Sequence, residues 1–417
     1  MGDTTVLPKW IKRLLPAVLL LAAPTVGAET PAQAGCRAMA QRVAAYSGSG
    51  PVFLRSFEKP EVLAPLDEPA LATTAFTYDN ALAAIALVSC GKVAEAERIG
   101  EALRLAATSD RHWRDGRLRN AYRAGPVESM PLPPGWYDKA AGRWAEDPHQ
   151  VGTSTGNVAW AALALLTLHE ATGKAPYRDA AAGAMLWVVN ATRDPSGPGG
   201  FAGGFHGFEP APDRLGWKST EHNLDAAAAL DWLARSTGEA RWREPAREAR
   251  AFLDAMWDAK GESGRFLIGT LPDGRTKATE RSGLDAQLWP ILGIADAPAG
   301  WRRALEHAER AHGVSGGYDF NDDRDGLWVE GTAQAALSWR AAGDGKRAGA
   351  LLAELARHVS PHGLLFATRE PRITTGLALG PASTNADFFY YRHPHLGATA
   401  WAVLAAQGWN PFTGKRL

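Results

Sequence analysis

The 417-residue chain carries 45 Lys and Arg residues against 45 Asp and Glu residues, so its formal net charge at pH 7 is zero. A chain so balanced has no overall field that would steer it to nucleic acid or to an anionic membrane surface, and we exclude both as partners. Its length exceeds that of one ordinary domain, but no linker-like stretch divides it, so we expect one large folded unit.

The N-terminal residues have the pattern of a secretory signal peptide. Lys9, Lys12 and Arg13 form a short basic region, and the following residues 14–26 are mostly apolar. Small residues precede Glu29, where cleavage would remove residues 1–28. The apolar run is short for a membrane span, although an uncleaved anchor is the alternative. We expect a periplasmic or secreted protein in which residues 29–417 form one domain and no membrane span remains.

Six short alanine-rich segments recur along the chain, and most begin beside a polar or acidic residue. They are apolar or small on nearly every side, which is typical of helices surrounded by protein. Between them lie longer stretches with apolar residues at spacings of three and four and a charged face, typical of helices that cover a core. We therefore predict an all-α ring of six inner helices wrapped by six outer ones. The inner segments are residues 81–88, 158–168, 224–234, 288–294, 331–339 and 398–406, and the outer ones 37–46, 93–107, 177–190, 242–257, 300–312 and 345–358.

The connections between these segments alternate in length. Short turns that contain Gly173, Gly238 and Gly343 follow inner segments, and glycine is the usual residue where a helix ends. Long connections rich in Gly, Pro and aromatic residues precede the inner segments and would gather at one rim of the ring. Long ordered loops usually carry function, so we expect a substrate to bind at that rim. They are residues 108–140, 193–219, 263–282, 313–327 and 363–394.

The chain has two cysteines, Cys36 and Cys90. In the predicted ring, Cys36 begins the helix before the first inner helix and Cys90 ends that inner helix. These two ends lie together in an antiparallel pair, and export permits a disulfide. We predict a Cys36–Cys90 bridge, with two buried thiols as the alternative.

This layout resembles the (α/α)6 toroid of the six-hairpin glycosidase superfamily, over nearly the whole mature chain. The segment Thr77-Tyr78-Asp79-Asn80 is similar to the aromatic-Asp starts of inner helices in toroid hydrolases. The resemblance implies hydrolysis of a glycosidic bond by two carboxylic acids, with a poly- or oligosaccharide as substrate and no cofactor. Related toroids include sugar epimerases and polysaccharide lyases.

Glycoside hydrolysis needs one carboxyl group that is protonated and another that is ionised. Glu330 follows Leu327-Trp328-Val329, and such apolar surroundings would favour a general acid. Its alternative role is an ordinary first-turn glutamate stabilised by the helix dipole. Asp79, beside Tyr78 and Asn80, is the preferred base, with N-capping as the alternative.

Two further inner-helix starts carry candidate carboxyl groups. Asp285 follows Ser282 in a pattern that also fits a capping box. Glu221 precedes Asp225 by four residues, which places both on one face of a helix. The sequence does not rank these four candidates firmly.

Aromatic and polar side chains at the helix starts and in the last loop are candidates for sugar contact, because sugar rings pack on aromatic faces and polar groups fix their hydroxyls. Arg392 could instead bind an anionic group on the substrate, or stack on a tyrosine to hold the last loop. The candidate set is Tyr78, Asn157, Trp217, His222, Asn223, Trp289, Trp328, Tyr390, Tyr391, Arg392 and His393.

Metal binding is not expected. Residues 319–325 and Glu330 have roughly the spacing of a calcium loop, but Arg324 stands where such a loop needs glycine. His393 and His395 are two residues apart with no third ligand in view, so we expect no zinc site.

Two functional alternatives stay open. A polysaccharide lyase would need a base and a group that neutralises a uronate carboxylate, and His222, Asn223, Tyr390, Tyr391 and Arg392 could supply them. A non-catalytic carbohydrate-binding component of a polysaccharide export machinery is the other alternative. An epimerase is less favoured, because few inner-helix starts carry histidine.

Overall fold

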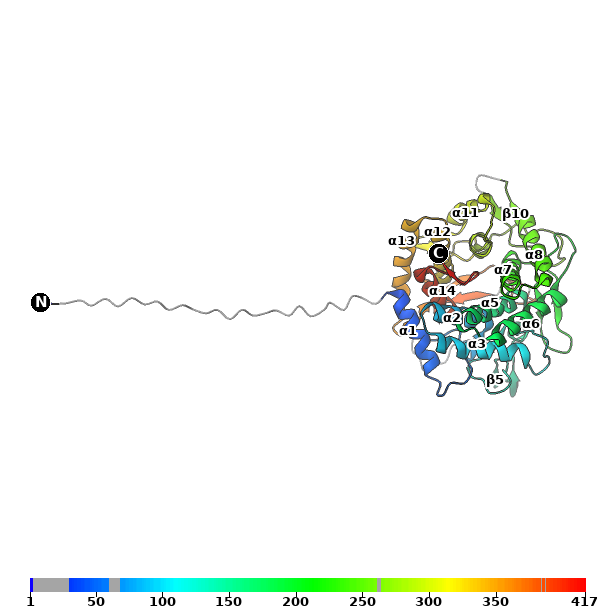
Figure 1. Ribbon diagram of the computed structural model, residues 1–417, viewed down its shortest axis with the longest axis horizontal. Coiled ribbons are helices and arrows are strands. Elements are labelled where there is room, and N and C mark those ends of the chain that lie inside the picture. Colours follow the sequence, from blue (N-terminus) through cyan, green and yellow to red (C-terminus); the bar gives the residue numbers. More distant parts are fainter. Residues whose placement is uncertain (3–29, 60–67, 261–263, 384, 387) are drawn as a thin grey trace.

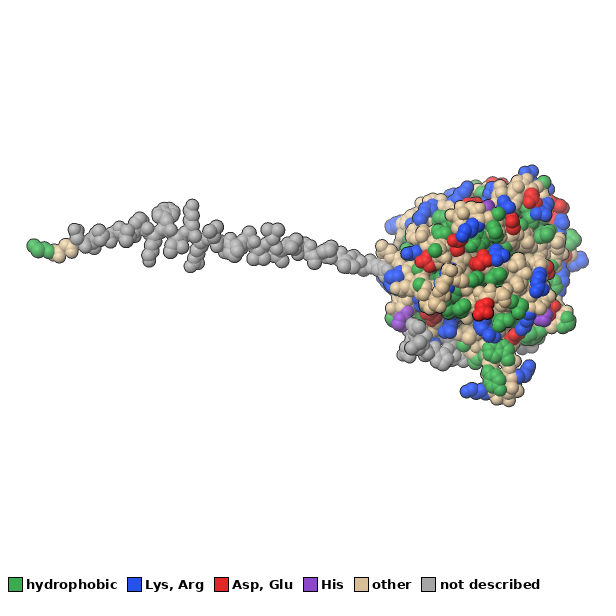
Figure 2. Space-filling view, turned by 60° about the horizontal axis from the view of Figure 1, so that its bottom comes forward, with side chains coloured by type: hydrophobic (Ala, Val, Ile, Leu, Met, Phe, Trp, Pro, Cys, Tyr) green, Lys and Arg blue, Asp and Glu red, His purple; other side chains and the backbone are tan. Residues whose placement is uncertain are grey.

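A computed structural model describes residues 1–2, 30–59, 68–260, 264–383, 385–386 and 388–417. The expected signal peptide falls almost entirely on residues outside these ranges. In the residues described, no helix is both long and apolar enough to cross a membrane. The folded part is viewed in Figure 1. Figure 2 shows Lys, Arg, Asp and Glu side chains of both signs intermingled on one face, as the balanced composition predicts.

Within the described chain, the helices form the two predicted sets. The inner set is α2 Thr77–Ser89, α5 Thr155–Thr172, α7 Thr220–Thr237, α9 Leu284–Leu288 with α10 Pro290–Gly293, α12 Val329–Ala341 and α14 Leu396–Gln407. The outer set is α1 Pro31–Ala44, α3 Val93–Thr108, α6 Ala175–Thr192, α8 Arg243–Met256, α11 Arg303–His312 and α13 Gly345–Leu355. The prediction of an all-α ring is confirmed.

Short helices and strands make up much of the remaining chain. They are α4 Pro148–Val151, η1 Pro69–Leu71, η2 Ala240–Trp242, η3 Ala299–Arg302, η4 Ala356–His358, β1 Val52–Phe53, β2 Thr74–Phe76, β3 Ala121–Arg123, β4 Gly125–Pro126, β5 Trp136–Asp138, β6 Arg143–Ala145, β7 Thr153–Ser154, β8 Gly204–His206, β9 Asp213–Leu215, β10 Trp257–Asp258, β11 Arg265–Phe266, β12 Gly313–Val314, β13 Gly317–Tyr318, β14 Leu365–Phe366, β15 Arg372–Thr374, β16 Phe389–Tyr391, β17 Pro394–His395, β18 Trp409–Asn410 and β19 Lys415–Arg416. The strands pair antiparallel in sheets of two or three strands.

The two sets of helices differ as their sequences predict. Residues 158–166 of α5 are buried on every side. In α8, the buried residues recur at spacings of three and four, and the remaining face is mostly charged. Inner helices are thus enclosed by their neighbours, and small alanine side chains allow the helix axes to approach closely.

Backbone hydrogen bonds close the ring. The first residue of each inner helix donates its N–H to a carbonyl in the connection before the next inner helix, at 2.9–3.0 Å. The sixth inner helix donates in the same way to the connection before the first inner helix, which closes the circle. α14 packs against α2 in the same closure. The donor–acceptor pairs are Thr77–Asn120, Thr155–Gly203, Thr220–Ile268, Leu284–Phe320, Val329–Ala367 and Leu396–Ser56. All the inner-helix starts are therefore held at one end of the ring.

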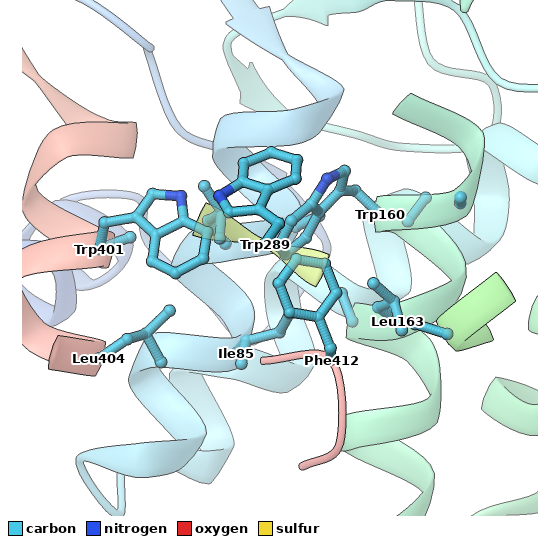
Figure 3. Packing of buried hydrophobic residues seen from close by; sticks show 14 of the residues in the cluster. Ile85, Trp160, Leu163, Trp289, Trp401, Leu404 and Phe412 are labelled. Atoms are coloured by element: carbon cyan, nitrogen blue, oxygen red, sulfur yellow. The ribbon is translucent and has the colours of Figure 1, made fainter. Parts of the chain in front are cut away.

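The fourth inner helix differs from the prediction, because it is broken. We expected a helix over residues 288–294, but α9 ends at Leu288 and α10 begins at Pro290. Proline has no N–H to continue the helical ladder, which accounts for the break. Trp289, at the break, packs against Trp160, Trp401 and Phe412 with ring centroids 5.5–5.9 Å apart. Figure 3 shows these four rings gathered together inside the ring of helices.

Amide side chains clamp the connections onto three inner helices. The fourth residue after the N-cap is Asn80 in α2, Asn223 in α7 and Gln287 in α9, and each amide makes two hydrogen bonds to one backbone residue of the preceding connection. For Asn223, Oδ1 accepts from Phe201 N–H at 2.8 Å and Nδ2 donates to Phe201 C=O at 3.0 Å. The clamps explain why these polar groups can be fully buried.

Replacing Asn223 with Ala should lower the free energy of unfolding by about 2–3 kcal/mol, because it leaves a buried N–H and C=O unpaired. Asn190→Ala, at an exposed position on α6, is the matched control and should change it by less than about 0.5 kcal/mol. Urea denaturation measures both. Equal effects in the two variants would contradict the clamp.

The predicted disulfide is confirmed. Cys36 and Cys90 are bonded, with their Cα atoms 6.0 Å apart. Cys36 lies inside α1 rather than at its start, because Thr30 caps that helix and Pro31 begins it. Cys90 is the C-cap of α2, so the bridge ties the first outer helix to the end of the first inner one.

Candidate active site

The second residue of each inner helix faces its neighbours at the end where the long connections gather. These residues are Tyr78, Gly156, Glu221, Asp285, Glu330 and Gly397. Three are acids on consecutive inner helices, and helix N-termini favour negative charge. Asp79 follows Tyr78, and Asp225 lies one turn deeper in α7. The structure therefore brings together all four predicted catalytic carboxyl groups and adds Asp225.

Glu330 is tied to the first and last inner helices. Its Oε1 accepts a hydrogen bond from the Tyr78 hydroxyl at 2.7 Å, and that hydroxyl accepts from Trp401 Nε1 at 2.8 Å. Burial raises the pKa of Glu330 to about 7, with His395 opposing this rise and Asp79 adding to it. The expectation of a carboxyl group held protonated by apolar surroundings fits this environment, but the Glu330 side chain is only 1% exposed.

His395 joins two of the carboxyl groups. Its Nε2 lies 3.3 Å from Asp79 Oδ2, and its Nδ1 lies 3.6 Å from Glu330 Oε2. Burial lowers the pKa of the imidazole, but Asp79 and then Glu330 outweigh it, and the net shift is upward. In the neutral ring, Nδ1 accepts from Ala398 N–H at 3.2 Å and caps α14. His395 thus caps α14 when its ring is neutral and is a charged partner for the two acids when it is protonated.

Gly397 allows this close approach. A Cβ atom there would lie 2.6 Å from Asp79 Oδ1 and 2.9 Å from Glu330 Oε2, well inside van der Waals contact. The same two distances place those oxygens at most 5.5 Å apart. Any larger residue at this position would push the acids away from each other or from His395.

Glu221 is the member of the group that solvent reaches most easily. Its side chain is 36% exposed, whereas those of Glu330 and Asp79 are 1% and 4% exposed. Protein nevertheless surrounds the carboxyl group, and this burial raises its pKa to about 7 against the effect of a hydrogen bond with Asp285. Glu221 therefore combines a pKa raised to about 7 with access for a ligand.

Asp285 and Asp225 are more enclosed. Burial raises the pKa of Asp285 well above its usual value, and Glu221, Glu330 and Asp225 raise it further. Burial and then Glu221 do the same for Asp225. By contrast, burial lowers the pKa of His222 to about 4, so this ring is neutral at pH 7. The N-cap of α9 is Gly283 without a side-chain cap, and that of α2 is Phe76, so Asp285 and Asp79 are not the capping residues that their sequences also allowed.

Tyr390 brings the last loop to this group. Burial raises the pKa of its phenol, and Glu330, Asp79, Asp285 and Glu221 all contribute to the rise. The half-buried ring packs against Trp328 and His395, with centroids 5.5 and 5.9 Å away. A neutral hydroxyl donor thus stands near four carboxyl groups, which agrees with a contact role for Tyr390.

Three of the predicted sugar-contact residues have structural roles instead. Asn223 is 0% exposed and clamps the backbone of Phe201, so its amide is not available to a ligand. Trp289 and Trp328 are 3% and 1% exposed. Trp289 packs in the aromatic cluster, and Trp328 packs under Tyr390 and against Phe320. For these residues, the expected ligand contact is contradicted by burial.

The remaining residues predicted to contact sugar differ in their exposure and in their partners. Trp217 and His222 are partly exposed beside each other, with ring centroids 5.4 Å apart, and Asn157 donates to Asn120 Oδ1 at 2.8 Å. Tyr391 pairs with Arg372 in the β15–β16 ladder, and His393 lies near Tyr391 and Glu68. Arg392 is exposed and stacks on Phe366, not on the tyrosine that the alternative role predicted, with its guanidinium 4.2 Å from the ring centroid.

Sequence reasoning missed three residues of this group. The sequence patterns suggest His395 only as a metal ligand and give Gly397 and Gln334 no role at the site. The available signal was position, because His395 and Gly397 flank the start of the sixth inner helix, and Gln334 lies one turn after Glu330.

A second acidic group lies in the loop before α12. Carboxylate oxygens of Asp319, Asp323 and Asp325 are within 4.8 Å of one another, and Arg324 adopts a left-handed conformation with φ of 56°. Burial raises the pKa of Asp319 to about 8. The expectation of no metal stays a prediction.

Comparison with known proteins shows the fold of the chain but not its family. No protein-family profile and no curated protein matches the chain. Solved structures that are similar include a wild-type glycosidase, with 12% identity and a TM-score of 0.56 over 90% of this chain and 96% of that one. A sugar epimerase from a ruminal bacterium has 11% identity and a TM-score of 0.60 over 89% and 96%. A GH76 α-mannanase from Bacteroides thetaiotaomicron has 11% identity and a TM-score of 0.53 over 92% and 97%. The chain has the (α/α)6 toroid fold.

Proposed function

We propose that this protein is an exported glycoside hydrolase that cleaves a poly- or oligosaccharide with two carboxyl groups. The observation that carries the proposal is the convergence of Asp79, Glu221, Asp225, Asp285 and Glu330 at one end of an (α/α)6 ring, among them two glutamates whose pKa burial raises to about 7. Hydrolysis of a glycosidic bond needs such a protonated acid beside an ionised partner.

We assign the general acid to Glu221 rather than Glu330. A general acid must lie within hydrogen-bond reach of the glycosidic oxygen, so a bound sugar has to touch it. Glu221 is 36% exposed, whereas Glu330 is 1% exposed and its Oε1 is engaged by Tyr78. Trp217 and His222 beside Glu221 offer an aromatic surface for the sugar.

We assign the base to Asp79. His395 Nε2 lies 3.3 Å from its Oδ2 and holds the carboxyl group in place. In this assignment Glu330 and His395 are positioning residues. They act through Asp79 and Tyr78 rather than on the substrate.

The charges at the site disfavour the lyase alternative. A lyase must neutralise a uronate carboxylate, and the arginine proposed for that task, Arg392, stacks on Phe366 instead. The acids shift one another's pKa, and His395 is the cation that acts most on Glu330. A uronate at this position would face several carboxyl groups.

Localisation in the periplasm or outside the cell is part of the proposal. The disulfide and the N-terminal basic and apolar pattern support it, because disulfides persist in oxidising compartments.

A reducing-end assay tests the activity. The purified protein is incubated with a panel of neutral, acidic and amino-sugar polysaccharides, and near-ultraviolet absorbance is followed in parallel. New reducing ends without new absorbance support the hydrolase. New absorbance would replace it with the lyase, because elimination leaves an unsaturated sugar. Binding without cleavage of any polymer would favour a carbohydrate-binding component of an export machinery.

A further inference from the structure

A group of buried polar atoms below Glu221 has no hydrogen-bond partner in the described part of the chain. The acceptors among them are Asp225 Oδ1, Asp285 Oδ1 and Glu330 Oε2. Asp225 and Glu330 are each 1% exposed, and Asp285 is 8% exposed. Leaving buried polar atoms unpaired is costly, so each such acceptor calls for a donor.

The residues that carry these unpaired atoms are close neighbours. Asp285 is close enough to Glu221, Glu330 and Asp225 for all three to raise its pKa. Gln334 is fully buried next to Asp285 and Glu330, and it lowers the pKa of both, but its amide falls short of hydrogen-bond geometry. Trp160 stands beside Asp225 and packs against Trp289, and its Nε1–H is a buried donor that also has no partner among the described residues. The acceptors therefore converge above the aromatic cluster.

Charge at this place is unbalanced. The charged groups that act most on Asp225, Asp285 and Glu221 are these acids themselves and Glu330, and no Lys or Arg is among them. His395, whose pKa is raised, is engaged by Asp79 and Glu330, and His222 is neutral. Tyr78 and Tyr390 contribute neutral hydroxyls. A ligand that brings both donors and positive charge would satisfy the group best.

We propose that the site binds a sugar with a free amino group, a hexosamine unit whose ammonium lies between Asp285 and Asp225 below Glu221. An ammonium has three donors and a full charge, whereas a hydroxyl has one donor and no charge, and an N-acetyl group has lost the charge. Glu221, with a side chain 36% exposed, is the member of the group that solvent reaches, and Asp285 is buried at 8%, so the amine enters past Glu221. This inference names the substrate class of the hydrolase proposed above and rests on that proposal for the reaction.

Binding of an amine should release a proton from the protein, whereas binding of a neutral sugar should not. Burial and mutual repulsion raise the pKa of these carboxyl groups, which favours their protonated form. An ammonium stabilises the ionised form, so a carboxyl group loses its proton when the amine binds. Binding should therefore release about one proton and tighten as the pH rises, as long as the amine stays protonated.

Titration calorimetry of the full chain tests this. A fully deacetylated glucosamine tetramer, its N-acetylated form and a neutral glucose tetramer are titrated in two buffers that differ in ionisation enthalpy. We expect about one proton released for the amine and none for the other two. We also expect the amine to bind at least about tenfold more tightly than its N-acetylated form. Equal affinity for the amine and its acetylated form, without proton release, would overturn the inference.

Variants locate the binding. Asp285→Asn and Asp225→Asn should each weaken binding of the amine about tenfold or more and leave binding of the neutral tetramer unchanged. Asp231→Asn is the matched control, because Asp231 is on the same helix as Asp225 but pairs with Arg250. If the Asn variants do not fold, the number of protons that the wild-type protein releases on binding the amine still tests the inference.

Different results would contradict the proposed hydrolase activity and the proposed preference for an amino sugar. Proton-linked amine binding without any cleavage would overturn the hydrolase and keep the inference. Cleavage of a neutral polymer with no amine preference would keep the hydrolase and overturn the inference.

Discussion

Glu221→Gln should lower kcat by about 10²–10⁴-fold on the polymer that the wild-type protein cleaves best. Glutamine keeps the shape of the side chain but cannot donate a proton to the leaving oxygen. The KM should change little, because the surrounding contacts with the sugar remain. In the wild-type protein, kcat/KM should fall as the pH rises above about 7, the value to which burial raises the pKa of Glu221. Initial rates of reducing-end release between pH 5 and 9 measure both effects.

The matched control is Glu244→Gln. Glu244 is also the second residue of a helix, but α8 is an outer helix and this side chain is 64% exposed, so activity should stay within a factor of two of the wild type. Asp79→Asn should match the loss in Glu221→Gln, since it removes the base. Full activity in Glu221→Gln together with a large loss in Glu330→Gln would return the acid role to Glu330.

The sequence predicts the ring because its determinants are local. Each inner helix is enclosed over its whole surface, so it consists of alanine and other apolar residues, and each outer helix has one apolar face. The Cys36–Cys90 bridge follows from the same order of helices, because it joins elements that are adjacent in the chain. Charge placement is also local, and the four predicted acids all stand at inner-helix starts.

The missed features depend on contacts that no local pattern encodes. His395 and Asp79 are 316 residues apart in the chain, and ring closure alone brings them to 3.3 Å. Gly397 is needed because two acids from other helices occupy the space of a side chain. The burial of Trp289 and Trp328 has the same origin: a tryptophan at a helix start can face a ligand or the core, and the packing of neighbouring helices decides between them.

The unliganded protein should be most stable in mildly acidic solution and lose stability as the pH rises toward 8. Glu330 has a folded-state pKa of about 7 against 4.5 for the ordinary group. Between these values the folded chain keeps a proton that the unfolded chain has lost, so rising pH favours unfolding by up to about 3 kcal/mol from this group alone. The raised pKa values of Asp225 and Asp285 act in the same direction. His395, whose pKa is also raised, contributes stability below 6.5 that is lost as the pH rises through its folded-state value.

Urea denaturation at pH 5, 6, 7 and 8 measures this dependence. Glu330→Gln should flatten the decline by up to about 3 kcal/mol, because the amide does not titrate. Glu244→Gln, with an exposed side chain, should leave the slope unchanged. Stability that rises over this range, or a slope unchanged in Glu330→Gln, would show that the acids are ionised in the folded protein. The amine should displace protons from Asp225 and Asp285, whose raised pKa contributes to this decline in stability. A bound glucosamine oligomer should therefore stabilise the protein more at pH 7 than at pH 5.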